Sequence, residues 1–167
     1  MVRREIFMAL LAGIFCASKA YADEPLQPPY RHQVTSPDKR AVAISDPKTG
    51  TKIVDAATGK ELWSMPGWFR WLFVSNDGQH LATGYDGMNL IPVNYNQDIV
   101  LITFWERGRK VKTIALRNIS PDASSLRRTV SHYRWGDIEG VNEHNQLVVT
   151  RADGRQYRFN IATGAAE

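Results

Sequence analysis

Tight-turn signals recur at short intervals along this chain, and they constrain its fold more than any other feature. Asn76-Asp77-Gly78 is the strongest signal, because these residue types tolerate the left-handed backbone that a type I′ hairpin requires. Further turns containing glycine or proline are expected at 46–50, 57–60, 86–87, 107–110 and 153–154. Apolar runs of four to seven residues lie between the turns, which is the length of strands. The pattern therefore predicts an all-β protein made of antiparallel hairpins.

The expected strands follow one another in chain order. They cover 41–44, 52–55, 61–65, 68–74, 80–85, 88–93, 99–105, 111–116, 146–151 and 156–161. The run 99–105 is the most apolar one after the first 22 residues and predicts a strand buried on both faces. Only 120–129 is helix-like, because Pro121 suits a first helical position. This piece is short and polar, so a loop fits it equally well.

The first 22 residues have the pattern of a removable export signal. Arg3 and Arg4 precede an uncharged run over 6–18, and Ala20-Tyr21-Ala22 is the small-x-small pattern of a signal-peptidase site. The run has 13 residues, fewer than the roughly 17–25 that span a bilayer. We therefore expect residues 1–22 to be a signal peptide, a periplasmic or secreted location, and no membrane-spanning segment after cleavage. A retained anchor and a twin-arginine signal are the alternatives.

Cleavage would change the composition of the chain. Cys16 is the only cysteine, so the remaining 145 residues would fold without a disulfide, on their hydrophobic core alone. Loss of three basic residues and one acidic residue would lower the formal charge from +4 to +2. Export and this near balance argue against nucleic acid as a partner.

The cleaved chain divides into two parts. Residues 23–35 contain Pro25, Pro28 and Pro29, which lack backbone donors and favour an extended N-terminal arm. Residues 36–167 are expected to form a single all-β domain.

Two copies of one pattern lie 105 residues apart: 54–59 reads VDAATG and 159–164 reads FNIATG. The first copy continues to Trp63, and Asp55-x-x-Thr58-Gly59-Lys60-x-x-Trp63 resembles the docking motif of quinoprotein-like propeller blades, although Ile53 replaces the usual alanine. That resemblance implies that Trp63 packs between neighbouring blades. The stretch 75–81, SNDGQHL, is similar to the opening of WD-like bacterial β-propeller repeats. The segment 71–135 also resembles a group of small exported bacterial proteins, whose motifs carry no assigned activity.

The length of the chain limits the number of blades. A WD-type blade takes about 40–45 residues, so the 145 residues after the leader hold about three. We therefore predict antiparallel meander sheets in about three blade-like units. A β-sandwich is the alternative.

Candidate binding residues lie where aromatic and polar residues gather near turns. The set is Trp68, Arg70, Trp71, Tyr85, Asp86, Asn89, His132, Tyr133 and Trp135. The tryptophans are expected to pack in the core between the sheets, with stacking surfaces for a ligand as the alternative and Trp68 and Trp71 as the first exceptions. Asp86 and Asn89 could ligate calcium, but the full loop of a calcium-binding hand is absent and a turn is the better interpretation. The histidines lack the paired spacing of a metal site, so we expect no metal, no catalytic residue and no cofactor.

These features favour a non-enzymatic binding or interaction module in the bacterial envelope that holds an envelope protein. The alternative is a protein that binds or processes a glycan, from the cell wall or lipopolysaccharide, through Trp68, Trp71 and Trp135. A quinone-cofactor enzyme fits less well, because the chain is too short for a full cofactor-holding propeller.

Overall fold

The computed structural model describes residues 26–167, whose strands pair into four antiparallel sheets. Each of the three larger sheets forms one blade, numbered here in chain order. The first blade is β1 (His32–Thr35), β2 (Ala41–Asp46), β3 (Gly50–Asp55) and β4 (Glu61–Met65). The second is β5 (Leu72–Val74), β6 (His80–Gly84), β8 (Val100–Glu106) and β9 (Arg109–Ala115). The third is β12 (Gly136–Val141), β13 (Gln146–Arg151) and β14 (Gln156–Asn160).

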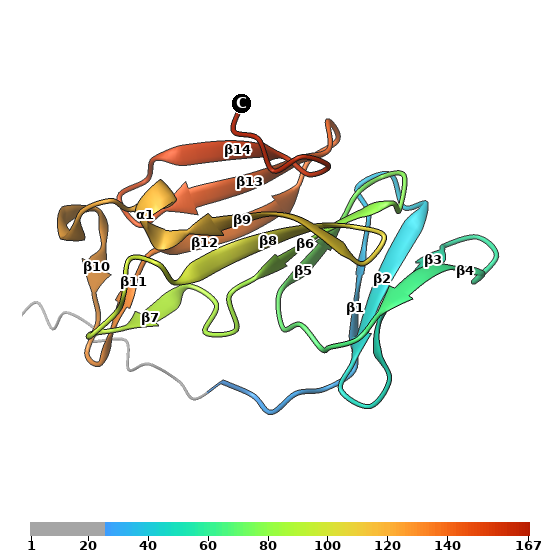
Figure 1. Ribbon diagram of the computed structural model, residues 1–167, viewed down its shortest axis with the longest axis horizontal. Coiled ribbons are helices and arrows are strands. Elements are labelled where there is room, and N and C mark those ends of the chain that lie inside the picture. Colours follow the sequence, from blue (N-terminus) through green and yellow to red (C-terminus); the bar gives the residue numbers. More distant parts are fainter. Residues whose placement is uncertain (1–25) are drawn as a thin grey trace, which may run out of the picture.

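The fourth sheet is small and lies at the end of the molecule away from the first blade (Figure 1). It contains β10 (Arg127–Arg128), β11 (His132–Arg134) and β7 (Leu90–Pro92). The helical elements in the described residues are α1 (Leu116–Ile119) and a 3-10 turn at Ala123–Ser125. Residues 26–167 are therefore all-β, with antiparallel sheets in three blade-like units, as the sequence predicts. The expected signal peptide at 1–22 lies outside the described residues.

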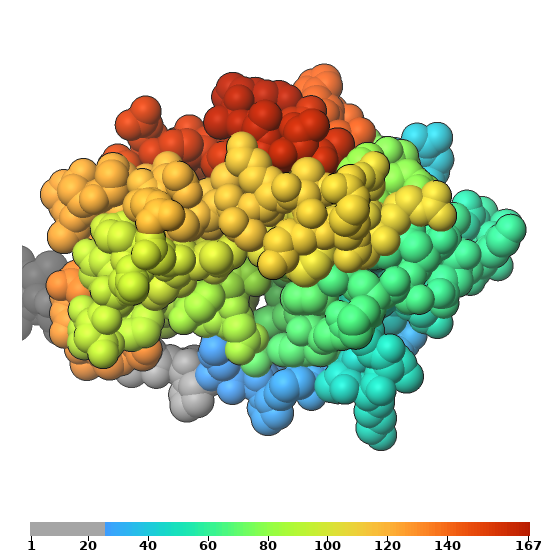
Figure 2. Space-filling view, viewed as in Figure 1, coloured from blue at the N-terminus to red at the C-terminus, as the bar shows by residue number. Residues whose placement is uncertain are grey.

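The first strands of the three blades lie side by side, and the blades spread outward from them like a fan. β1 contacts β5, and β5 contacts β12, so these three strands form the inner edge of the fan. Figure 1 shows the first blade apart on the right and the third blade above the second. In Figure 2 the yellow atoms of β9 lie between the red third blade and the green to teal first blade.

Two hydrophobic cores fill the spaces between the blades. The core between the first and second blades contains Ile53, Trp63, Leu72 and Leu81. Trp63 is 7% exposed and its indole Nε1 donates to the Gly78 carbonyl in the next blade at 2.6 Å. A tryptophan packed between neighbouring blades is what the resemblance implied for this position.

The core between the second and third blades is larger. It combines β6 and β8 with the inward side chains of the third blade and with Ile91 and Trp135 from around the small sheet. Its fully buried members of largest volume include Trp135, Phe104, Leu101, Ile102 and Leu147. Leu101 on one face and Ile102 and Phe104 on the other are buried, so the middle of the run 99–105 is covered on both faces as predicted, whereas Val100 is 42% exposed.

One strand prediction was wrong over half its length. The expected strand at 68–74 begins only at Leu72, because residues 66–71 bend toward the N-terminal segment. The expected strand at 111–116 is confirmed as β9, which ends at Ala115; α1 follows, where the Asn118 side chain accepts the Ala115 backbone N–H at 2.9 Å. Within the helix-like piece 120–129, only the single 3-10 turn forms, and β10 follows it.

Three further features of the sheets were not predicted from the sequence. β7 leaves the second blade between β6 and β8 and pairs instead with β11, about 40 residues later in the chain. β12, which the sequence did not indicate as a strand, is the inner strand of the third blade. The sheet structure also begins earlier than residue 36, because His32–Thr35 pairs with β2 within the segment expected to be an arm.

Candidate functional site

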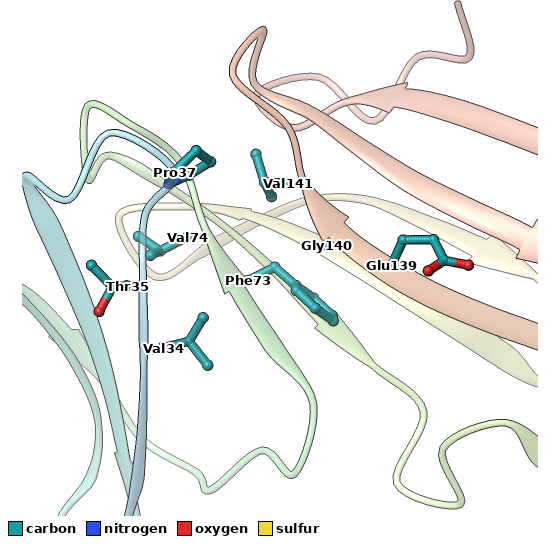
Figure 3. A pocket seen from close by; sticks show the side chains of 8 residues that line it. All are labelled: Val34, Thr35, Pro37, Phe73, Val74, Glu139, Gly140 and Val141. Atoms are coloured by element: carbon teal, nitrogen blue, oxygen red, sulfur yellow. The ribbon is translucent and has the colours of Figure 1, made fainter.

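A groove of about 230 Å³ lies where the inner strands of the three blades converge. Figure 3 shows side chains from β1, β5 and β12 around one space, with the Phe73 ring extending from β5 toward the β12 side. The lining residues are Val34, Thr35, Pro37, Phe73, Val74, Glu139, Gly140 and Val141. Because all three blades contribute, the groove exists only when the blades are assembled.

A β-bulge places the only charged residue of the groove. β12 pairs through Ile138 with Val149 and then through Gly140 with Val148, so Glu139 has no partner in the ladder. Gly140 has a φ of 130°, a backbone conformation that side-chain-bearing residues rarely adopt. Bulges of this kind redirect a side chain. Glu139 is exposed and makes no hydrogen bond or ion pair with any residue of 26–167.

Turns from the three blades are hydrogen-bonded to one another near the groove. Asn76 accepts the Asp38 backbone N–H at 3.0 Å with its side chain, and its own backbone N–H donates to the Asn145 side chain at 2.8 Å. The Asn76 amide also donates to the Glu143 carbonyl at 3.3 Å. One asparagine of the second blade therefore ties together turns of the first and third blades. These contacts link the turns that follow the three inner strands.

The pKa of the Asp77 carboxyl, in the same turn, is lowered. Burial raises the pKa of its carboxyl, but hydrogen bonds from the Ser75 hydroxyl and the Gln79 backbone N–H, together with His80, outweigh burial and hold the pKa below 3.8. The ionised carboxylate therefore organises the turn through the hydrogen bonds that it accepts. This role is structural, and it explains why aspartate suits this position.

Three of the candidates lie next to the N-terminal residues 26–31: Trp68, Arg70 and Asp86. The Trp68 indole donates to the Tyr30 carbonyl at 2.8 Å, and Arg70 donates to the Gln27 carbonyl at 2.8 Å. Arg70 also pairs with Asp86, Nε to Oδ1 at 3.3 Å, and its guanidinium lies 4.9 Å from the centre of a Trp68 ring. The Arg70 side chain is only 11% exposed. The chain's own residues 26–31 therefore occupy this cluster.

Trp71, Trp135 and Asn89 belong to the larger core and its border. The Trp71 and Trp135 rings meet edge to face, with centroids 6.4 Å apart. Trp135 is fully buried and donates from Nε1 to the Met88 carbonyl at 2.7 Å, and Asn89 donates to Asp137 at 3.0 Å. Tyr85 packs at the edge of the same core. Trp135 therefore offers no ring face to solvent.

His132 and Tyr133 lie on β11 in the small sheet. The Tyr133 ring meets Tyr95 edge to face at 5.6 Å, and Arg128 lies 5.1 Å from the centre of the Tyr133 ring. His132 Nδ1 and the Ser131 hydroxyl are 2.8 Å apart. The nine sequence candidates thus form three groups, of which the second and third are joined where Tyr133 packs against the core that contains Trp135, and none of the nine lines the groove.

The sequence reasoning missed Phe73 and Glu139 as groove residues. A Glu-Gly pair inside a strand is a bulge signal, and this signal at 139–140 could have identified the inner edge of the third blade.

No set of three His, Cys, Asp or Glu residues within 26–167 is arranged to hold a metal ion. No helix in that range is long and apolar enough to cross a membrane.

Solved structures similar to this chain include WD40 β-propellers. The crystal structure of the RRP9 WD40 repeats and the structure of U3-55K each align with a TM-score of 0.45 and 15% identity. A structure of a eukaryotic initiation factor aligns with a TM-score of 0.40 and 18% identity. The alignments cover 86% of this chain but only 39%, 39% and 35% of those chains. No protein-family model and no curated protein sequence matches the chain.

Proposed function

We propose that this protein is a non-enzymatic binding module, exported to the bacterial envelope, that holds a protein partner in the groove between its inner strands. The observation that carries the proposal is the groove itself, whose lining combines Val34, Phe73 and Val141 with the free carboxylate of Glu139. A pocket with an apolar lining can take an anchor side chain of a protein partner.

The lining specifies the chemistry of the partner. An apolar side chain would contact Phe73 and the valines, and a neighbouring lysine or arginine would meet Glu139. Because the carboxylate is exposed and unpaired within the described residues, the pairing would contribute modestly to affinity, about 0.2–1 kcal/mol, and more to orientation.

The glycan alternative needs Trp68, Trp71 and Trp135 to present open ring faces together. Trp135 is fully buried, and the Trp68 indole N–H is already bonded to the Tyr30 carbonyl. For this reason the proposal places the partner in the groove.

The test uses three immobilised proteins that begin at Asp23: the unchanged chain, Glu139→Lys and the control Glu143→Lys. Glu143 is an exposed acid on a neighbouring turn outside the groove. Envelope extract is passed over each, and retained proteins are identified by mass spectrometry. We expect a protein retained by the unchanged chain and by Glu143→Lys but lost with Glu139→Lys. Retention of the same proteins by all three would refute the groove as the binding site.

The export component has its own test. Protein isolated from the native host is expected to begin at Asp23 by N-terminal sequencing. An intact leader in that material would contradict export by signal cleavage.

A further inference from the structure

Residues 26–31, with the sequence LQPPYR, lie against Trp68 and Arg70 as an extended segment. Within residues 26–167 this segment belongs to no strand or helix and makes no backbone–backbone hydrogen bond. Proline fixes φ near −65° at positions 28 and 29, and it keeps the residue before each proline extended. These constraints favour the polyproline II conformation, which has no internal hydrogen bonds.

Two hydrogen bonds hold the segment, and both are accepted by its backbone. The Trp68 indole donates to the Tyr30 carbonyl at 2.8 Å, and Arg70 donates to the Gln27 carbonyl at 2.8 Å. Three residues complete one turn of a polyproline II helix, so the carbonyls of residues 27 and 30 point to the same side of it. The two donors therefore recognise the conformation of the backbone rather than particular side chains.

The two donors are positioned by their neighbours. Arg70 Nε pairs with Asp86 Oδ1 at 3.3 Å, and the guanidinium lies 4.9 Å from the centre of a Trp68 ring. The His32 ring meets Trp68 edge to face with centroids 5.9 Å apart, and its Nε2 lies 2.9 Å from the Phe69 carbonyl oxygen. The indole and the guanidinium are thus oriented by residues outside the segment 26–31.

The segment itself makes few contacts through its side chains. Leu26 is 47% exposed, Tyr30 is 50% exposed, and both prolines are exposed. Segments with few buried contacts open at a low free-energy cost. Because the site bonds to carbonyls, a partner segment of the same conformation can make the same two hydrogen bonds.

A notch of about 290 Å³ beside Trp68 is not covered by the segment 26–31. Its lining includes Pro47, Pro66 and Trp68, which provide apolar surface, and Lys48 at the β2–β3 turn. The segment 26–31 is continuous with β1 and does not line the notch. A partner segment has no such constraint and can add contacts in the notch to the two hydrogen bonds.

We propose that Trp68, Arg70 and this notch form a binding site for a proline-rich polyproline II segment of a partner protein. Residues 26–31 occupy the site until such a segment displaces them. Aromatic-lined surfaces recognise preformed polyproline II segments at a low entropic cost. The tethered segment competes at a high effective concentration, so it suppresses binding of weak partner segments. None of the site's residues lines the groove, and the proposal does not depend on the groove.

The test measures fluorescence anisotropy of a labelled LQPPYR peptide with two proteins that begin at Asp23. One is the unchanged chain, and the other carries Pro28→Gly and Pro29→Gly, which make its own segment more flexible and costlier to dock. We expect the peptide to bind the double variant about tenfold more tightly than the unchanged chain. A matched LQGGYR peptide should bind the double variant about tenfold more weakly than LQPPYR, a readout obtained on one and the same protein.

Further substitutions in the double variant locate the site. Trp68→Phe and Arg70→Gln should each weaken LQPPYR binding about tenfold, because each removes one donor. Arg127→Gln on the small sheet and Glu139→Lys in the groove should leave it unchanged, which separates this site from the groove. Equal binding of the two peptides, binding that survives Trp68→Phe, or no binding to the double variant at millimolar peptide would overturn the proposal. Equal binding of LQPPYR to the unchanged chain and the double variant would overturn occupation of the site by residues 26–31.

Discussion

Replacement of Trp63 by phenylalanine tests whether the first two blades are locked by one hydrogen bond and one ring. The Trp63 Nε1 donates to the Gly78 carbonyl at 2.6 Å from a position that is 7% exposed. Phenylalanine leaves this buried acceptor unpaired, at a cost of about 1–3 kcal/mol. The smaller ring gives up about 1 kcal/mol of transfer free energy. We therefore expect the free energy of unfolding to fall by about 2–4 kcal/mol.

Urea unfolding followed by circular dichroism measures this loss. With a denaturant slope of about 2 kcal/mol/M, the midpoint should fall by about 1–2 M with the slope unchanged. Trp68→Phe is the matched control: its indole also donates to a carbonyl, but in an exposed contact with Tyr30, and it should cost about 1 kcal/mol or less. A Trp63→Phe loss below about 0.5 kcal/mol, or one no larger than the control, would refute the locking role.

Three further perturbations have defined outcomes. In Gly136→Ala the new Cβ would collide with the Thr150 carbonyl oxygen, so unfolding free energy should fall by about 1–3 kcal/mol in urea titrations. Gly154→Ala, with a φ of 91° and no atom within 4 Å of the new Cβ, measures the cost of the positive φ without a collision. The folded pKa of Asp77 lies below its ordinary value of 3.8, so the ionised carboxylate stabilises the folded protein above pH 3.8, and this stabilisation is lost as the pH falls through the folded pKa. Between about pH 6 and pH 2.5 the free energy of unfolding of Asp77→Asn should therefore decrease less than that of the unchanged protein. In Arg70→Gln the loss of the bonds to Gln27 and Asp86 should raise amide exchange at 26–31 but not in β6, as hydrogen-exchange mass spectrometry would show.

The sequence predicts the hairpins of this protein well because each hairpin is a local event. Gly78 and Gly154 adopt the positive φ values of 65° and 91° that their turns require, and glycine reaches such values without steric cost. The repeated patterns at 54–59 and 159–164 both end in a glycine with φ near 70° or 65°. Local turn chemistry and short apolar runs were therefore sufficient to predict the all-β class and the three units.

The partner of β7 could not be predicted in the same way. β7 is three residues long, and β11, its partner, lies about 40 residues away. Nothing within a short strand specifies such a partner, because the pairing depends on the packing of Ile91 and Trp135 in the shared core. The same reasoning applies to the 66–71 segment, which bonds to residues 27–32 and also to Ser45 and Thr51, all distant in the sequence.

The candidate site was the least predictable part. The clusters of aromatic residues in the sequence mark side chains that pack in the core, because a large ring gains most from burial. Trp135 is fully buried, and Trp63 is nearly so. The groove is made instead by Val34, Phe73 and Glu139, which are ordinary residues in three different strands. These residues come together only because the three blades pack at particular angles to one another, and no local sequence pattern indicates those angles.

The free face of the third blade carries mostly polar side chains. Gln146, Thr150, Gln156 and Arg158 lie on it beside the apolar Val148. The groove, in contrast, combines the exposed Glu139 carboxylate with the partly exposed Phe73 ring. Because an apolar ring next to a charge can anchor a partner side chain and a polar face offers no such anchor, recognition by this fan should proceed through its inner strands rather than through the free face of the third blade.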